Sequence, residues 1–156
     1  MGSFSDFARH MDWAGLVSLL LTVAAVLLCL TVHETCHGLA AYALGDPTAK
    51  RQHRLSLNPL RHLDLVGTLM MLVAGFGWAR PVPVDMRYFK HPKSGMALTA
   101  LAGPVSNLAL AYLALVVRAL LLGVYYRSGL TVLLGVVNFC GTVAVLSIGL
   151  GIFNLI

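Results

Sequence analysis

Two histidines and a glutamate lie close together in the stretch LTVHETCHGLAAYALGD, residues 30–46. In a helix, the spacing His33-Glu34-x-x-His37 places both imidazoles on one face, one turn apart, where they can share a metal ion. Glu34 lies further around the helix, so its carboxylate can reach a water molecule without being a ligand. Zinc suits two neutral imidazoles, a carboxylate and an open position. We therefore predict a hydrolytic zinc site in which His33 and His37 are ligands and Glu34 takes and returns the proton.

The chain that carries this motif is unusually apolar. Of its 156 residues, 58% are hydrophobic and only 11% are charged, whereas about a quarter of the residues in a soluble domain are charged. Each of three segments without a charged residue meets the requirement of about 20 residues for a membrane-spanning helix. These segments are residues 13–33, 94–117 and 128–156. A fourth apolar stretch, residues 65–79, is shorter and contains three glycines, so we expect a re-entrant or interfacial segment there.

We therefore expect an all-α polytopic membrane protein with about three transmembrane helices, over residues 13–44, 94–122 and 130–156. Its basic residues occupy the two loops on either side of the short apolar segment. They are Lys50, Arg51, Arg54, Arg61, Arg80, Arg87, Lys90 and Lys93. If the short segment does not cross the membrane, both loops lie on one side, which the positive-inside rule makes cytoplasmic. A basic face beside anionic lipid accounts for the net charge of +5, so we expect the lipid bilayer as a partner and no nucleic acid.

The loops give weaker signals. Residues 48–57, between two turn sequences, are expected to pair as short strands at the membrane surface. Three prolines exclude a helix over residues 75–92, GFGWARPVPVDMRYFKHP, and part of this segment is a candidate for lining the entrance to the site. The histidines outside the motif lie in polar loops, where we expect solvated side chains. They are His10, His53, His62 and His91.

Ionisable groups within a membrane helix are costly to bury, which makes them functional by default. An alternative is that Glu34 only forms a structural ion pair with a buried histidine. Cys36 is a conceivable soft metal ligand, although a packed apolar cysteine is the simpler interpretation. Asn107 and Asn154 lie on the other two expected helices at levels that bring them toward His37, but asparagines in membranes also join helices by hydrogen bonds.

Five stretches occur in a characteristic order along nearly the whole chain: HETCHG, LSLNPLRHLDLVGT, GFGWARPVPV, LAGPVSNL and the terminal FNLI. With them the chain resembles the site-2 protease family of intramembrane zinc metalloproteases, in its compact prokaryotic form. This resemblance implies cleavage of transmembrane helices of other proteins, often anti-sigma factors or similar regulators. It implies that His33 and His37 bind Zn²⁺ and that Glu34 is the catalytic base. It also implies that Asn154 and Asn107 lie at the site, where they help to hold the substrate or the oxyanion.

One element of the family pattern is missing from the sequence. The family's third zinc ligand is the aspartate of a Leu-Asp-Gly motif that would follow Ile156, so we expect residues 1–156 to be a single domain that is incomplete at its C-terminus. Asp64 has the right chemistry for a substitute ligand, but its position favours capping the segment that follows. Activity of the chain as given does not follow from the resemblance.

The function that these observations favour is an intramembrane zinc metalloendopeptidase in the inner or plasma membrane, with its site facing the cytoplasm. It would hydrolyse peptide bonds in or near transmembrane segments of substrate proteins. One alternative is a metal transporter or another metal-binding membrane protein, and a second is a non-catalytic fragment or pseudoprotease. The sequence indicates neither the substrate nor the oligomeric state.

Overall fold

A computed structural model describes residues 12–74 and 80–155, and within these ranges the chain forms helices and no strand. The helices are α2 (Trp13–Ala43), α3 (Thr48–Arg51), α4 (Leu65–Ala74), α5 (Pro92–Ser128) and α6 (Val132–Phe153), with single 3₁₀ turns at Pro59–Arg61 and Met86–Tyr88. Three of them, α2, α5 and α6, are long and apolar enough to cross a membrane. The predicted all-α membrane fold with three long helices is confirmed.

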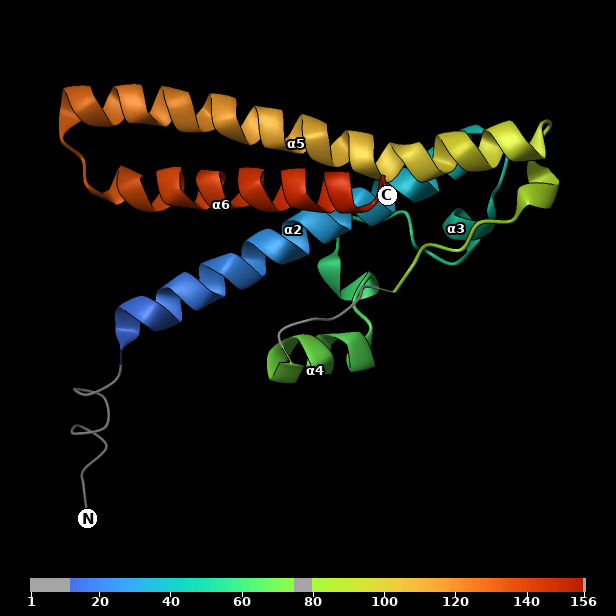
Figure 1. Cartoon of the computed structure of the whole chain (residues 1–156), viewed down its shortest axis with the longest axis horizontal. Helices are drawn as coiled ribbons and strands as arrows, with labels where there is room; N and C mark the ends of the chain where they lie inside the picture. Colours follow the sequence, from blue (N-terminus) through green and yellow to red (C-terminus); the bar gives the residue numbers. More distant parts are fainter. Residues whose placement is uncertain (1–11, 75–79, 156) are drawn as a thin grey trace, which may run out of the picture.

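Helices α5 and α6 form an antiparallel hairpin, and α2 crosses it at an angle (Figure 1). The hairpin turns at Gly129, which ends α5 with a left-handed φ of 68°, a conformation that glycine adopts without a steric penalty. Residues 13–24 of α2 are exposed, and its first buried residue is Ala25. Consequently, only the C-terminal part of α2, which carries the histidine motif, packs against the hairpin.

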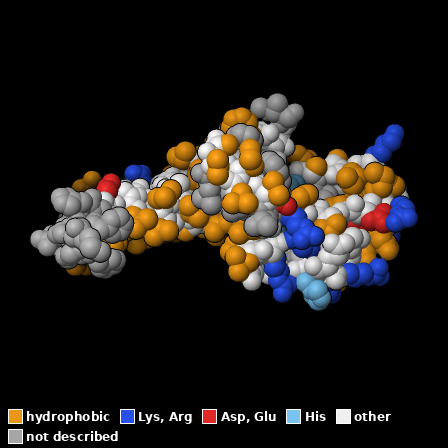
Figure 2. Space-filling model, turned by 90° about the horizontal axis from the view of Figure 1, so that it is seen from below, with side chains coloured by type: hydrophobic (Ala, Val, Ile, Leu, Met, Phe, Trp, Pro, Cys, Tyr) orange, Lys and Arg blue, Asp and Glu red, His pale blue; other side chains and the backbone are white. Residues whose placement is uncertain are grey.

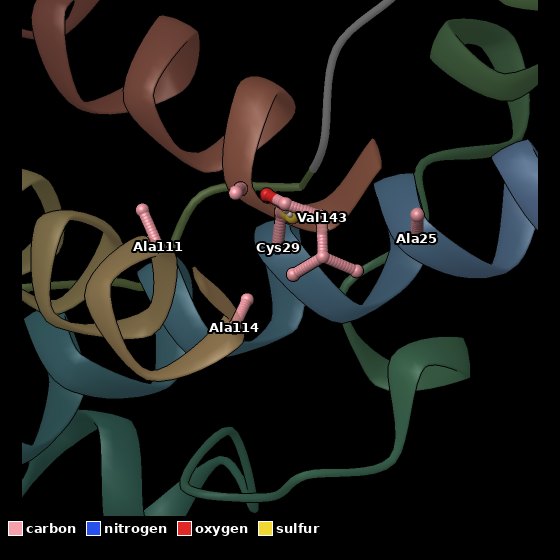
Figure 3. Close-up of a cluster of buried hydrophobic side chains, with 6 residues drawn as sticks. Ala25, Cys29, Ala111, Ala114 and Val143 are labelled. Carbon is pink, nitrogen blue, oxygen red and sulfur yellow. Dashed lines mark hydrogen bonds between the residues drawn. The ribbon is translucent and has the colours of Figure 1, made fainter. Parts of the chain in front are cut away.

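Small side chains fill the place where the three helices meet (Figure 3). The buried cluster consists of Ala25, Cys29, Ala111, Ala114, Val143 and Ala144. Such residues let helix backbones approach closely, which is how helices associate in lipid. Cys29 Sγ also lies 3.1 Å from Ser147 Oγ on α6. These contacts fix α2 against the hairpin one turn before His33.

The strands predicted for residues 48–57 are wrong, because the segment begins with helix α3. The Asp46 carboxylate accepts the backbone N–H of Thr48 at 2.9 Å, and this contact starts a helical turn in the manner of an N-terminal cap. Ala49 is fully buried and lies against the position of Gly38 on α2. The local capping group and the buried alanine favour the turn over an extended strand.

The short apolar segment forms α4 over its first ten residues, and residues 75–79 lie outside the described ranges. A ten-residue helix is about 15 Å long, about half of the apolar thickness of a bilayer. It is not among the helices that are long enough to cross a membrane, and the re-entrant or interfacial placement stays a prediction. Asp64 Oδ1 accepts the N–H of Gly67 at 2.8 Å, so the predicted capping role of Asp64 is confirmed.

Basic side chains gather toward one end of the molecule, whereas apolar side chains cover much of the rest of the face in Figure 2. Seven of the eight loop cations named above are exposed: Lys50, Arg51, Arg61, Arg80, Arg87, Lys90 and Lys93. The eighth, Arg54, is only 7% exposed. Large apolar side chains on α2, α5 and α6 are exposed as well, an arrangement that suits helices surrounded by lipid.

Candidate metal centre

The two histidines of the motif point toward each other from successive turns of α2. Their Nε2 atoms are 3.0 Å apart, and their rings meet edge to face with centroids 4.6 Å apart. Two imidazoles that bind one zinc ion at 2.0–2.1 Å in a tetrahedral arrangement place their nitrogens about 3.3 Å apart. His33 and His37 therefore need only a small adjustment to share one metal ion.

A backbone carbonyl sets the tautomer of His37. Its Nδ1 lies 2.7 Å from the carbonyl oxygen of Thr99 on α5. Because a carbonyl only accepts hydrogen bonds, Nδ1 carries the proton and Nε2 keeps its lone pair. This is the tautomer that binds a metal through Nε2, and a carbonyl partner on the other ring nitrogen is usual for such ligands.

The side chain of Asn107 contacts the Nδ1 atom of His33, as the Thr99 carbonyl contacts that of His37. Its side chain is fully buried, and its amide group lies 3.1 Å from His33 Nδ1 through Nδ2, while the buried Oδ1 has no partner in the described part of the chain. Rotation of the amide by 180° exchanges these two atoms. In that orientation Oδ1 would accept a proton from Nδ1, His33 Nε2 would be available as a ligand, and Nδ2 would take the position that has no partner. The predicted role of Asn107 at the substrate or oxyanion stays a prediction.

Gly103 on α5 provides the space for both imidazoles. A Cβ atom at this position would lie 2.6 Å from His37 Cε1 and 2.7 Å from His33 Cε1. The added Cβ would lie even closer to His37 Nε2, the atom that faces the position where both histidines would share a metal ion. The glycine therefore lets α5 lie against the metal-binding edge of the histidine pair, where an added Cβ would force the imidazoles to move.

We expect Gly103→Ala to weaken zinc binding by more than 10–100-fold, which is about the loss that follows when a supporting group of a metal ligand is removed. The added methyl group would push both imidazoles apart, whereas α5 itself gains helix propensity from the exchange. A competitive zinc titration measures the effect. Gly123→Ala is the matched control, since a Cβ at Gly123 on the same helix meets nothing within 4 Å; equal zinc affinity in both variants would contradict this role of Gly103.

Glu34 faces the extended segment formed by residues 80–85. Its Oε2 accepts the backbone N–H of Val82 at 3.1 Å, and Oε1 has no hydrogen-bond partner within residues 12–74 and 80–155. The alternative in which Glu34 forms an ion pair with a buried histidine is not observed in these ranges. One carboxylate oxygen is thus fixed, and the other is available to a water molecule.

Three residues that sequence reasoning did not assign to the site hold this extended segment. Arg54 Nη2 donates to the carbonyls of Arg80 at 3.0 Å and Pro81 at 3.2 Å. The His62 carbonyl accepts the N–H of Arg80 at 2.8 Å, and Asp46 Oδ2 accepts the N–H of Asp85 at 2.7 Å. Burial, followed by the nearby Arg80 charge, lowers the pKa of Arg54, and the Glu34 carboxylate opposes this shift.

The prediction that His62 is solvated is wrong. Its side chain is only 2% exposed, and its Nε2 donates to the Ser56 carbonyl at 2.7 Å. Thr35 on α2 packs beside the ring at 3.4 Å. The imidazole thereby fastens the loop after α3 to the helix that carries the motif. His53 and His91 are exposed as predicted, and His10 lies outside the described residues.

Two curated proteins are similar to this chain. "Putative zinc metalloprotease YwhC" from Bacillus subtilis (strain 168) is 54% identical over 91 residues, which are 58% of this chain and 42% of that protein. "Putative zinc metalloprotease Rip2" from Mycolicibacterium smegmatis (strain ATCC 700084 / mc(2)155) is 28% identical over 116 residues, 71% of this chain and 44% of that protein. The chain is a homologue of these metalloproteases. This homology agrees with the resemblance that the sequence motifs indicated.

The chain spans less than half of the length of these two metalloproteases. No protein-family model matches the chain, and no solved structure matches it significantly. Both relatives are named as putative zinc metalloproteases, and the three long apolar helices suit a membrane protein.

The structure does not bring every predicted residue to the histidine pair. In the part of the chain that the structure describes, no three His, Cys, Asp or Glu side chains gather into a metal site. A ligand role for Asp64 or Cys36 stays a prediction. Asn154 ends α6 with an exposed side chain whose Nδ2 donates to the Leu150 carbonyl at 2.8 Å. Its role at the substrate or oxyanion stays a prediction. The two imidazoles fit zinc in donor type and spacing, and His37 also fits in tautomer. They supply two of the ligands that zinc requires.

Proposed function

We propose that this chain carries the two-histidine half of a zinc site in an endopeptidase that cleaves peptide bonds in or near transmembrane segments. The observation that supports this most strongly is the pair of Nε2 atoms, 3.0 Å apart on a long apolar helix. Each imidazole has a buried partner on α5, and a carboxylate follows directly on the same helix. The names of the two relatives support the same class of enzyme.

The residues of the chain divide the work as follows. His33 and His37 would hold zinc through Nε2, while the Thr99 carbonyl and Asn107 keep both rings oriented. Zinc in such a site lowers the pKa of a water molecule and polarises the substrate carbonyl. Glu34 Oε1 takes the proton of the attacking water and delivers it to the departing amine nitrogen. The Val82 N–H keeps Oε2 in place throughout.

The membrane setting follows from the charge distribution. We place the basic end of the molecule on the cytoplasmic side and let α2, α5 and α6 cross the bilayer. His37 precedes the end of α2 by six residues, a depth of about 9 Å at helical rise. The site would therefore lie within reach of cytosolic water, which hydrolysis requires. A substrate helix must open locally there, because its peptide bonds are protected by its own hydrogen bonds.

Metal removal tests this proposal in lipid vesicles that contain the chain and a fluorescent reporter protein with one transmembrane segment. We expect cleavage within or beside that segment, its loss after treatment with a strong zinc chelator, and its return when zinc is added. Zinc carried into the vesicles without cleavage would instead indicate a transporter. Zinc binding with neither cleavage nor transport would indicate a non-catalytic protein, and both results would contradict the proposal.

A further inference from the structure

The hydrogen bond that holds Glu34 comes from an unusual backbone position. Val82 lies between Pro81 and Pro83, and proline has no backbone N–H. The Val82 N–H is therefore the only backbone donor between Arg80 and Val84. It points at Glu34 Oε2, and no neighbouring amide in this stretch can replace it.

Arg54 holds the opposite side of the same peptide group. The Pro81 carbonyl and the Val82 N–H belong to one peptide unit, whose atoms are coplanar and, in the trans form, point in opposite directions. No cis peptide bond occurs in the described residues. Arg54 Nη2 binds the Pro81 carbonyl at 3.2 Å, and Glu34 binds the N–H on the other side at 3.1 Å. A contact that fixes the Pro81 carbonyl therefore also fixes the direction of the Val82 N–H.

The environment of Arg54 argues against an ordinary surface role. Its side chain is only 7% exposed, whereas the other cations of the two loops are exposed. Within the described residues, its side chain donates to carbonyl oxygens and not to a carboxylate. Burying a charge is costly unless it makes strong hydrogen bonds. A cation on a carbonyl also polarises the peptide group and strengthens its N–H as a donor.

We propose that Arg54 is a positioning residue for Glu34, acting through the peptide group between Pro81 and Val82. It fixes the carbonyl, the planar peptide transmits the orientation, and the N–H holds one oxygen of the carboxylate. The contact to the Arg80 carbonyl fixes the preceding peptide and prevents rotation of the segment. The consequence for catalysis rests on the proposed protease function, whereas the hydrogen-bonded arrangement does not.

Hydrogen exchange of single amides in the zinc-free chain in detergent tests the arrangement. A peptide that covers Pro81 to Pro83 reports on Val82 alone. We expect Arg54→Ala to accelerate exchange at Val82 by about 10-fold or more, the effect of losing a hydrogen bond to a charged group. The Asp85 N–H, which is held by Asp46 at the far end of the same segment, should keep its exchange rate.

Two further variants sharpen this test. Arg54→Lys keeps the charge but lacks the planar fork, so it should give an intermediate rate at Val82 even if Arg54→Ala folds poorly. Arg61→Ala is the matched control, since this exposed arginine binds one loop carbonyl, that of His53, at 2.7 Å. Unchanged exchange at Val82 in Arg54→Ala would overturn the proposal. Equal acceleration at Val82 and Asp85 would overturn it as well, because it would show a general structural role.

The catalytic consequence has a separate measurement. In an active preparation, Arg54→Lys should lower kcat while KM and zinc content stay at the wild-type values, because substrate and zinc contact other groups. An unchanged kcat would overturn the positioning role. If the wild-type chain neither bound zinc nor cleaved a substrate, the proposed function would fail, and the exchange rate of Val82 would still decide whether Arg54 holds this peptide.

Discussion

Glu34→Gln should abolish cleavage while zinc stays bound. A side chain that takes and returns a proton contributes about 10²–10⁴-fold to the rate, and an amide cannot do so. The exchange preserves size, and the glutamine oxygen can accept the Val82 N–H as Glu34 Oε2 does. Its effect should therefore fall on kcat. The rate of reporter cleavage and the zinc content, both measured on the same preparation in vesicles, test these two expectations.

Asp85→Asn is the control for this exchange. It also neutralises a carboxylate next to the site's extended segment, but Asp85 pairs with exposed Arg87, and such surface pairs contribute little. We expect wild-type cleavage from the control. Full cleavage by Glu34→Gln would show that Glu34 is not the base. Loss of zinc in Glu34→Gln would show that the carboxylate is a metal ligand, in conflict with the geometry described here.

His33→Ala and His37→Ala should each weaken zinc binding severely. Loss of a group that merely supports a ligand costs about 10–100-fold in metal affinity, and removal of one of two imidazole ligands must cost more. The two variants should behave alike, because the Nε2 atoms face the same point. Competitive titration with a chromophoric zinc indicator measures both affinities.

The matched control for the histidine variants is His53→Ala, which removes an exposed loop imidazole. We expect wild-type zinc affinity there. If His33→Ala kept the wild-type affinity while His37→Ala lost it, the pair would not share one ion. If neither exchange changed the affinity, the metal would bind elsewhere.

The long helices and the histidine pair were predictable because their signals are local. A run of about 20 apolar residues is sufficient to indicate a membrane helix, and i, i+4 spacing within such a run places His33 beside His37. The cap at Asp64 was also predictable from its position directly before α4. These features depend on neighbours in the sequence and very little on the path of the chain.

The buried loop residues that hold the segment beside Glu34 were not predictable in the same way. Arg54 and His62 lie in a polar loop and have the composition of solvated residues, yet both are buried against α2 and residues 80–82. Their burial depends on where two loops meet in space, which no local pattern encodes. The misassigned strands at residues 48–57 have the same origin, since Asp46 binds the N–H of Thr48, the first residue of α3, and also that of Asp85, 39 residues away.

X-ray absorption at the zinc edge of the zinc-loaded chain tests most directly whether His33 and His37 bind one zinc ion together. We predict two imidazole nitrogens at about 2.0–2.1 Å, with the remaining positions occupied by oxygen. The outer-ring scattering of both imidazoles should disappear in the double variant His33→Ala/His37→Ala. A sulfur shell at about 2.3 Å, the distance of a cysteine ligand, or a spectrum without imidazole scattering would contradict the account.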